Sequence, residues 1–431
     1  YILHITLLLA FWGYGQDTEF KNLQEVLNLA EKRSYTTLLA TEQRNLAQTT
    51  VLSAYGNALN PRIPVAASIT DNAKLPVNFI PAEAFGGPPG TFRQITLGQQ
   101  YISSLNIAPQ FDLVNPGNIA RIKSAKINRQ LTESNLLLSK KTLFDQVNAC
   151  YHNILSFDAQ IQLLQSNLLV ADSIMRIVSN KYTQGLVRKQ DLNDAEVNKI
   201  TILDKIQQAT LNLDQQYLSL GVLCDTEGKI KISQSLWAVT ADTTTLQAQG
   251  DLLVSNSEVQ KAYASAEYGA SKWQHLPTLS FVSALNWQNN SNRKFFDESQ
   301  PWINSNYWSL RLSWDFPTQI NKLINLKTTQ INYQMAKITA AHNTLLNKAQ
   351  NEQLEKDLLK ALAQHKNNIS IFKLKQENYE KSMNQFEANI LSLDRLLIAH
   401  NELIISQINV ALSLSNISFT HSKIEINNQI R

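Results

Sequence analysis

Residues 181–195 read KYTQGLVRKQDLNDA, and residues 385–399 read QFEANILSLDRLLIA. The two stretches align at one offset of 204 residues (386 − 182), which pairs aromatic with aromatic, apolar with apolar and alanine with alanine: Tyr182 with Phe386, Leu186 with Ile390, Leu192 with Leu396 and Ala195 with Ala399. The same offset pairs Ile127-Asn128 with Ile331-Asn332. An offset held over some seventy residues indicates that the chain is internally duplicated.

The duplication extends towards the N-terminus with a different offset. Tyr55-Gly56 matches Tyr268-Gly269 at an offset of 213 (268 − 55), and a proline follows nine residues after each tyrosine. The offset changes between the paired strands, where the first half has the longer loop, residues 71–93. Each half is predicted to contain a helix, two strands and two long helices. The predicted helical stretches are 18–59, 117–221, 252–273 and 318–420, and the predicted strands are 62–70, 94–113, 277–288 and 306–316.

Heptad spacing in the long helices predicts coiled-coil packing. Leu396, Leu403, Val410 and Ile417 step by seven, and the run from Ile161 to Tyr182 steps alternately by three and four. Such a repeat places a narrow apolar seam on a helix and makes neighbouring helices wind around one another. A helix of about 50 residues is roughly 75 Å long, a length typical of ducts, stalks and rods.

The predicted strands alternate between apolar and polar residues, which indicates one buried and one wet face. We expect eight of the apolar residues to face lipid: Leu105, Ile107, Phe111, Trp287, Trp308, Leu310, Leu312 and Trp314. Strands of about ten residues with aromatic residues near their ends are typical of membrane barrels, although a soluble antiparallel sheet also alternates. Four strands cannot close a barrel, so three copies of the chain are expected to pool about twelve.

The composition argues against several other classes of protein. The chain has 431 residues and a formal net charge of +4, without a block of Lys and Arg, so nucleic-acid binding has little support. It contains no G-x-S-x-G motif, no P-loop and no zinc-protease motif, and we expect neither enzymatic activity nor a cofactor or metal. The two cysteines, Cys150 and Cys224, are interpreted as free thiols.

The N-terminus begins with a short apolar run, residues 2–12, followed by Gly13-Tyr14-Gly15. The run has the length of a signal-peptide core and is too short to span a bilayer as a helix. We therefore interpret residues 1–16 as a signal-peptide remnant with cleavage near Gly15. A buried apolar strand is the alternative.

The stretch from Tyr182 to Ala195 resembles the signature of the TolC family of outer-membrane channels: an aromatic residue, two variable residues, Gly, two apolar residues, then an Asp-apolar pair leading to Ala. The passage from Leu105 to Ala120, in which Asn115-Pro116-Gly117 opens a long helix, is similar to the family's strand-to-helix crossing. The resemblance covers essentially residues 17–420 and rests on the repeat and its layout more than on one motif.

The resemblance implies a mainly α fold with membrane β-strands: a homotrimer whose long coiled-coil helices form an α-barrel tunnel and whose four strands per protomer form a shared 12-stranded β-barrel. The implied domains are residues 17–221 (first repeat), 222–250 (an equatorial connector), 251–420 (second repeat) and 421–431 (a C-terminal tail). The implied location is the outer membrane of a Gram-negative bacterium, with a long periplasmic extension. The implied partners are outer-membrane lipid, a periplasmic adaptor protein and an inner-membrane pump.

The resemblance also places a gate at the periplasmic tips of the two helical hairpins. The residues implied there are Tyr182, Gly185, Leu186, Asp191, Phe386, Asn389, Asp394 and Arg395. The second repeat departs from the signature, since Asn389 replaces the glycine and Arg395 stands opposite Asp191. We hypothesise that Asp191 pairs with Arg395, within or between protomers.

The function expected from these features is that of an outer-membrane exit duct in a tripartite efflux pump or a type I secretion system. Such a duct would be a passive conduit, opened at its tip by the adaptor and the pump. The alternative is a structural periplasmic coiled coil or adhesin stalk, which the heptads alone would also fit. Strands with alternating aromatic faces favour the duct, because a stalk does not need them.

Overall fold

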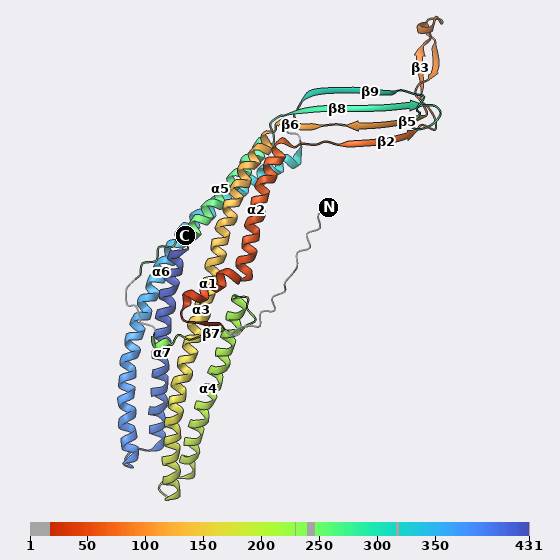
Figure 1. The fold of residues 1–431 in the computed structure, drawn as a ribbon. Helices are drawn as coiled ribbons and strands as arrows, with labels where there is room; N and C mark the ends of the chain where they lie inside the picture. The colour runs from red at the N-terminus through yellow and green to blue at the C-terminus, as the bar shows by residue number, and fades with distance from the viewer. Residues whose placement is uncertain (1–17, 229, 239–245, 316–318, 431) are drawn as a thin grey trace. The chain divides into compact units, whose positions relative to one another are not determined.

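The computed structural model describes residues 18–228, 230–238, 246–315 and 319–430 (Figure 1). The predicted signal-peptide remnant, residues 1–16, lies outside these ranges. The chain divides into two units, each described here by itself. The helical unit comprises the described residues within Tyr1–Arg44, Thr132–Glu258 and Ile338–Arg431, and the sheet unit comprises those within Asn45–Leu131 and Val259–Lys337.

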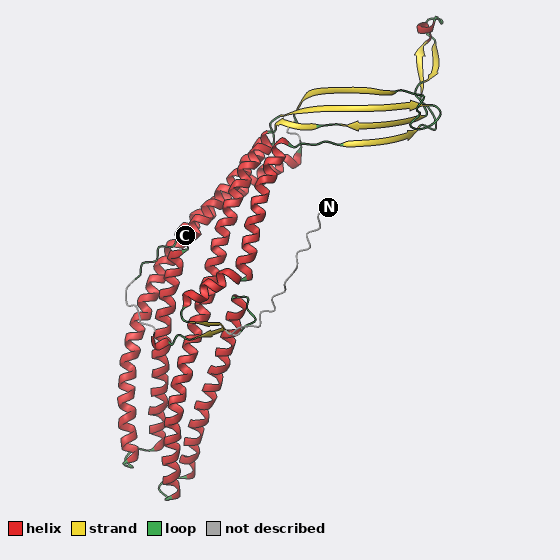
Figure 2. Ribbon diagram, viewed as in Figure 1, coloured by secondary structure: helices red, strands yellow, loops and turns green. Residues whose placement is uncertain are grey.

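Seven α-helices form in the described residues (Figure 2). They are α1 (Leu23–Arg33), α2 (Tyr35–Leu59), α3 (Pro116–Thr183), α4 (Lys189–Leu223), α5 (Leu252–Trp273), α6 (Ile320–Glu387) and α7 (Leu393–Gln429). The order of helix, strands and two long helices occurs twice, as the duplication predicted. The predicted helix 18–59 is wrong in one respect, because strand β1 (Thr18–Phe20) precedes it and Ser34 divides it into α1 and α2. Helix α7 also continues to Gln429, beyond the predicted end at residue 420.

Helix α1 begins where the sequence supplies an N-cap. The side chain of Asn22 accepts a hydrogen bond from the backbone N–H of Glu25 at 3.0 Å, which satisfies one of the free donors of the first turn. Glu25 in turn accepts from the backbone N–H of Lys21 at 2.9 Å. This local pairing separates β1 from α1 and explains why one continuous helix does not form there.

The core of the helical unit contains the predicted heptad seam. Leu396, Leu403 and Ile417 of α7 are each less than a tenth exposed, and Val178 of α3 is fully buried. A second part of the core joins Tyr151 and Leu155 of α3 to Val26 of α1 and Leu220 of α4. Among the described helices, only α7 is long and apolar enough to cross a membrane by length and composition, and 56% of its apolar window is buried within the chain. That burial is typical of a core helix.

The predicted connector, residues 222–250, starts in the last turn of α4 and then forms strand β7 (Ile230–Ile232) and a short 3-10 helix, η2 (Leu236–Ala238). Strand β7 pairs in parallel with β1, and Ser233 donates its backbone N–H to the carbonyl oxygen of Phe20 at 3.0 Å. Ile230 and Leu236 are buried in the same core as Phe20. The connector therefore packs as a small mixed layer against the helices.

The sheet unit contains an antiparallel sheet of β2 (Val65–Asp71), β5 (Tyr101–Ile107), β6 (Gln110–Val114), β8 (Thr278–Ser291) and β9 (Trp302–Ser313). Strands β5 and β6 pair with successive segments of the same edge of β8. They form one interrupted strand, because Pro109 between them has no N–H to donate to the ladder. The sheet is therefore four strands wide, in the order β2, β5/β6, β8, β9, which confirms the predicted number.

The predicted strand 94–113 is wrong at its start. Strand β4 (Phe92–Thr96) pairs with β3 (Val77–Pro81) in a separate hairpin, which lies inside the long loop of the first repeat. Gly98 has a φ of +116°, so the chain turns out of the hairpin before β5 begins. Ile95, which belongs to that predicted strand, pairs with Asn78 in this hairpin.

The turns between the paired long helices have the same backbone conformation in both repeats. Gly185 has a φ of +73° and Asn389 a φ of +59°. Gly185 donates its N–H to the carbonyl oxygen of Tyr182 at 2.9 Å, and Asn389 donates its N–H to that of Phe386 at 3.1 Å. Asn adopts the left-handed region more readily than most residues other than glycine. The structure thus explains why the second repeat functions with Asn at this position.

We predict that Gly185→Val destabilises the first hairpin by about 1–2 kcal/mol. No atom lies within 4 Å of a Cβ added at Gly185, so the cost comes from the backbone alone. Hydrogen exchange of the tip amides should rise by about five- to thirtyfold in Gly185→Val. Gly56→Ala, inside α2 and equally unobstructed, is the control and should slow exchange locally. Equal exchange in Gly185→Val and the wild type would contradict the prediction.

Candidate functional site: the apolar sheet face and the hairpin tips

The strand register places the predicted apolar residues in rows on one face of the sheet, here called the apolar face. Each row joins residues directly opposite one another: Leu105 with Trp287, Ile107 with Leu285, Phe111 with Phe281, Phe281 with Leu310, Leu279 with Leu312, and Ser283 with Trp308. Trp314 follows the end of β9, and its indole N–H donates to the carbonyl oxygen of His275 at 3.0 Å. Seven of the eight predicted residues therefore share one face within the strands.

The apolar face is uncovered and long enough to cross most of a membrane band. Trp308, Leu310 and Leu312 are 73%, 59% and 70% exposed. On β8 the apolar side chains extend from Leu279 to Trp287, which is eight residue steps or about 26 Å along the strand at roughly 3.3 Å per residue. The outward apolar band of a membrane barrel is about 25 Å tall, and its strands are tilted by about 35–45°, so this length covers most of the band.

In the middle of the sheet, on β5 and β8, the same face becomes polar beyond Trp287. Ser103, Asn289 and Ser291 lie there, and the β8–β9 loop covers them. Asn289 donates to the carbonyl oxygen of Asp297 at 3.0 Å, and hydrogen bonds from Ser291 and Ser299 lower the pKa of Asp297 to about 2. The loop thus marks the end of the apolar band.

The opposite face, here called the polar face, carries hydroxyl and amide side chains along its length. Ser68 of β2 lies 2.8 Å from Ser104 of β5, oxygen to oxygen. Asn106 faces Asn286, and Ser280 faces both Asp112 and Arg311. A sheet that is apolar on one side and polar on the other suits a boundary between lipid and water.

The sheet is open at both edges. Strands β2 and β9 each pair on one side only within the described part of the chain. Their outer edges therefore present unpaired backbone N–H and C=O groups. In a hydrocarbon environment each unpaired group costs several kcal/mol, so the sheet requires strands from other chains.

The tips of the α3–α4 and α6–α7 hairpins pack against each other. Phe386 is 3% exposed and lies in a cluster with Ile174 and Val178 of α3, Ala195 of α4 and Leu396 of α7. Tyr182 and Leu186, the other aromatic and apolar tip residues predicted in the first repeat, are exposed by 39% and 61%. The predicted tip residues thus divide into a buried anchor in the second hairpin and an exposed surface on the first.

The charges at the tip pair differently from the expectation. Asp191 accepts from the backbone N–H of Arg188 at 2.8 Å and forms an ion pair with its guanidinium at 3.2 Å. These hydrogen bonds lower the pKa of the Asp191 carboxyl, and Asp194 and Asp394 also raise the pKa of Arg188. Within one chain the partner of Asp191 is therefore Arg188, which lies on the same turn, and the expected pairing with Arg395 of the same chain is wrong.

Lys181 is the tip residue that sequence reasoning missed. Its Nζ donates to the carbonyl oxygen of Phe386 at 2.8 Å and to Oδ1 of Asn389 at 2.7 Å. It also lies 4.3 Å from the centre of the Phe386 ring. Lys181 thus joins the first hairpin to the turn of the second. The available signal was its position beside the aromatic residue of the signature, opposite Gln385 in the alignment.

In the described ranges, no group of three or more His, Cys, Asp or Glu side chains is placed to hold a metal ion. Cys150 and Cys224 are both free thiols, as interpreted from the sequence.

Comparisons with known proteins identify the fold. No family model matches the chain, and no curated protein matches its sequence. Among solved structures, the outer membrane protein VceC from Vibrio cholerae has a TM-score of 0.73 at 13% identity, covering 93% of this chain and 94% of VceC. The Campylobacter jejuni CmeC outer membrane channel has a TM-score of 0.70 at 14% identity, covering 94% of this chain and 84% of CmeC. The open state of the Neisseria gonorrhoeae MtrE outer membrane channel has a TM-score of 0.69 at 12% identity, covering 92% and 88%.

The chain therefore has the fold of outer-membrane channels of the TolC-like type, a helical portion combined with a membrane-type sheet. The likeness extends over nearly the whole chain, and it confirms the fold class expected from the duplicated sequence.

We predict that the two faces of β9 tolerate charge differently. Leu310→Arg, on the apolar face opposite Phe281, should destabilise the membrane form by about 2–4 kcal/mol. Ser309→Arg, one residue away on the polar face, should be tolerated. The measurement is the yield of folded, heat-resistant protein from outer membranes. Equal yields for the two variants would contradict the assignment of the apolar and polar faces.

We predict that Lys181 stabilises the contact between the hairpins. Lys181→Met removes two hydrogen bonds and a ring contact, and hydrogen exchange across residues 384–392 should become about fivefold faster, as for a loss of about 1 kcal/mol. Lys189→Met is the matched control, because the ammonium group of Lys189 lies over the ring of Tyr182 in its own hairpin, at 5.7 Å. If both variants exchange alike, Lys181 does not link the hairpins.

Proposed function

We propose that the chain is one protomer of a homotrimeric exit duct in the outer membrane of a Gram-negative bacterium. The duct conducts solutes passively, without a catalytic step, through a β-barrel and a helical tunnel that extends into the periplasm. Its open tip receives substrates from an inner-membrane pump through a periplasmic adaptor. The whole assembly is a tripartite efflux pump or a type I secretion system.

The open, two-faced sheet carries the proposal. Its apolar face runs for about 26 Å along β8 and is uncovered, and its two edges need strands from other chains. Three copies supply about twelve strands, which close a barrel around an aqueous lumen lined by the polar face. The eight residues from Leu105 to Trp314 named above would then contact lipid, and the fold shared with outer-membrane channels supports this arrangement.

The helices offer a matching seam for neighbouring copies. Ile331, Ile338 and Leu345 of α6 step by seven and are 48%, 70% and 71% exposed. Leu211 and Leu218 of α4 have the same spacing and are 55% and 73% exposed. Heptad positions of this kind are apolar because another helix covers them. Adjacent protomers in a trimer would supply those helices.

The hairpin tips would form the periplasmic gate, with Tyr182, Gly185 and Leu186 on one hairpin and Phe386 and Asn389 on the other. The exposed Leu186 and Ile390 would meet the adaptor. Arg188 competes for Asp191 inside the chain, so a role for Arg395 with Asp191 is confined to neighbouring protomers. Arg395 is exposed and could serve such a contact, whereas the neighbouring Asp394 accepts hydrogen bonds from Ser392 and from backbone N–H groups.

A structural stalk is the other reading of the long heptad helices. A stalk has no use for a sheet that exposes Trp308, Leu310 and Leu312 on one face, so the duct is favoured.

We predict that the protein purifies from membranes as a trimer, because a barrel completed by several chains has no stable folded monomer. Multi-angle light scattering should give about three times the chain mass of 48.6 kDa after the detergent is subtracted. The trimer should also conduct ions across a planar bilayer. A stable monomer that retains its full strand content would refute the shared barrel, and a trimer that never conducts would favour the stalk.

A further inference from the structure

Charge is distributed unevenly between the two units. The sheet unit contains 15 Lys and Arg but only 7 Asp and Glu, a net charge of +8. The whole chain contains 39 and 35, so the remainder has 24 and 28, a net charge of −4. A strongly basic unit produces a positive potential over its surfaces, and a narrow passage through it concentrates that potential.

Two arginines of the sheet unit lie on the polar face by register. Arg311 of β9 is opposite Ser280, which in turn is opposite Asp112. Arg62 forms a backbone bridge with Gln110, and Gln110 is opposite Val282 on the same face. Arg311 is exposed and Arg62 lines an open groove, so both guanidinium groups are available to solutes.

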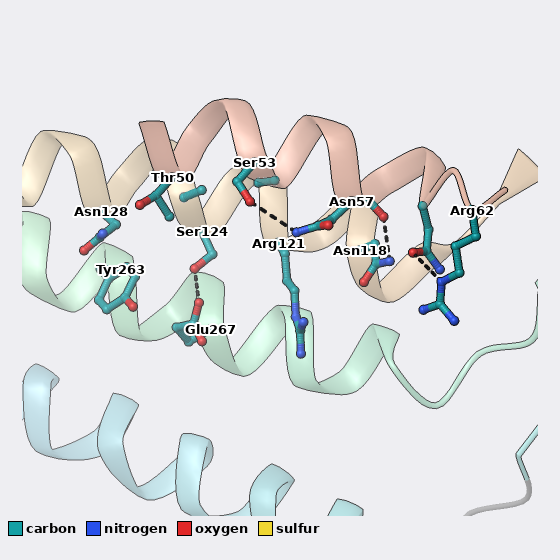
Figure 3. Close-up of a pocket in the computed structure, with 13 residues that line it drawn as sticks. Thr50, Ser53, Asn57, Arg62, Asn118, Arg121, Ser124, Asn128, Tyr263 and Glu267 are labelled. Atoms are coloured by element: carbon teal, nitrogen blue, oxygen red, sulfur yellow. Dashed lines mark hydrogen bonds between the residues drawn. The ribbon is translucent and has the colours of Figure 1, made fainter. Parts of the chain in front are cut away.

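A third arginine lies where the helices meet the sheet. A polar groove of about 550 Å³ runs between α2, α3 and α5 and is lined by Arg62, Asn118, Arg121 and Glu267, among others (Figure 3). Asn60 also lines this groove and donates to Oδ2 of Asp112 on the polar face at 3.4 Å. The groove is therefore continuous with the polar face. Figure 3 shows Arg121 reaching from α3 towards α5.

The acidic residues beside these arginines are already engaged. Asp112 is 4% exposed and accepts from Asn115 at 2.8 Å and Ser280 at 2.7 Å. Glu267 accepts a hydrogen bond from the buried hydroxyl of Ser124. The three arginines exceed the two carboxylates by one charge per chain, and the exposed groups are the positive ones.

The opposite side of α3 differs in character. Ile119, Lys123 and Ile127 line a separate, mainly apolar groove with Trp273 of α5. Lys123 is thus two residues from Arg121 in sequence but on the other side of the helix. Lys123 can therefore serve as a control for Arg121, because it carries the same positive charge but lies outside the groove that Arg121 lines.

We propose that Arg62, Arg121 and Arg311 form a positively charged collar that makes the passage selective for anionic solutes. The inference rests on the proposed duct, in which the polar face and its groove line the lumen. Three protomers would place nine guanidinium groups around the passage where the helices enter the barrel. Solutes bearing carboxylate, sulfonate or phosphate groups would be concentrated there, and cationic solutes would be depleted.

The test measures the local potential with a cysteine on the polar face. Ser309→Cys lies in the same row as Gln110 and Val282 and two residues from Arg311. The purified trimer is labelled with an anionic, a cationic and a neutral methanethiosulfonate reagent, and each rate is divided by that with a free small thiol. Labelling of the parent protein, which retains Cys150 and Cys224, is subtracted.

We expect the anionic reagent to be favoured at low salt. Removing one positive charge about 10 Å away changes the local concentration of a monovalent reagent roughly twofold, so Arg311→Gln should lower the anion-to-cation rate ratio about fourfold. Arg121→Gln should lower it in the same direction, whereas Lys123→Gln should change it little. The preference should disappear at 1 M salt, where the screening length is about 3 Å.

The outcomes separate the two proposals. If the neutral reagent does not reach the cysteine in the trimer, the polar face does not line a lumen, and the duct and the collar both fail. If the neutral reagent reacts but the wild type shows no anionic preference, or Lys123→Gln acts like Arg311→Gln, only the collar is overturned.

Discussion

The rest of the structure depends on the unpaired backbone N–H and C=O groups along the outer edges of β2 and β9. In water these groups would be hydrated, but beside an apolar face that excludes water they need hydrogen-bond partners from another chain. In the proposed membrane setting the sheet therefore requires strands from other chains. The exposed apolar heptad positions on α4 and α6 also need to be covered by another chain, so the helices add to the requirement that the sheet imposes.

The duplication explains how one chain supplies two nearly equivalent hairpins that have different tasks. The turns keep the same left-handed backbone at Gly185 and Asn389, so the scaffold is conserved between the repeats. The side chains around the turns have diverged: Lys181 and the Arg188–Asp191 pair belong to the first hairpin, and the buried Phe386 belongs to the second. In a ring, such hairpins alternate, so a tip built from them has threefold rather than sixfold symmetry.

Periodic features of the sequence predicted the repeat, the heptad seam and the apolar rows, because each depends on backbone geometry that recurs along an element. Single-residue events were harder to predict. The segment 94–113 was predicted as one strand, yet Gly98 and Pro109 divide it into part of a hairpin and two strand segments. The pairing of Asp191 with Arg188 follows from a capping interaction three residues apart, and an alignment of the repeats cannot show it. The contact of Lys181 with Phe386 joins residues 205 positions apart, beyond any local pattern.

Because of the β3–β4 hairpin, the length of the connection between β2 and β5 can change without changing the register of those two strands. It lies in the connection between β2 and β5, yet those strands still pair residue for residue from Val65 with Ile107 to Asp71 with Tyr101. Residues can therefore be added or removed at its tip, around the short turn from Ala82 to Gly90, without shifting a row of the main sheet. On the proposed orientation that tip projects from the cell surface, which makes it the natural place to display a foreign peptide.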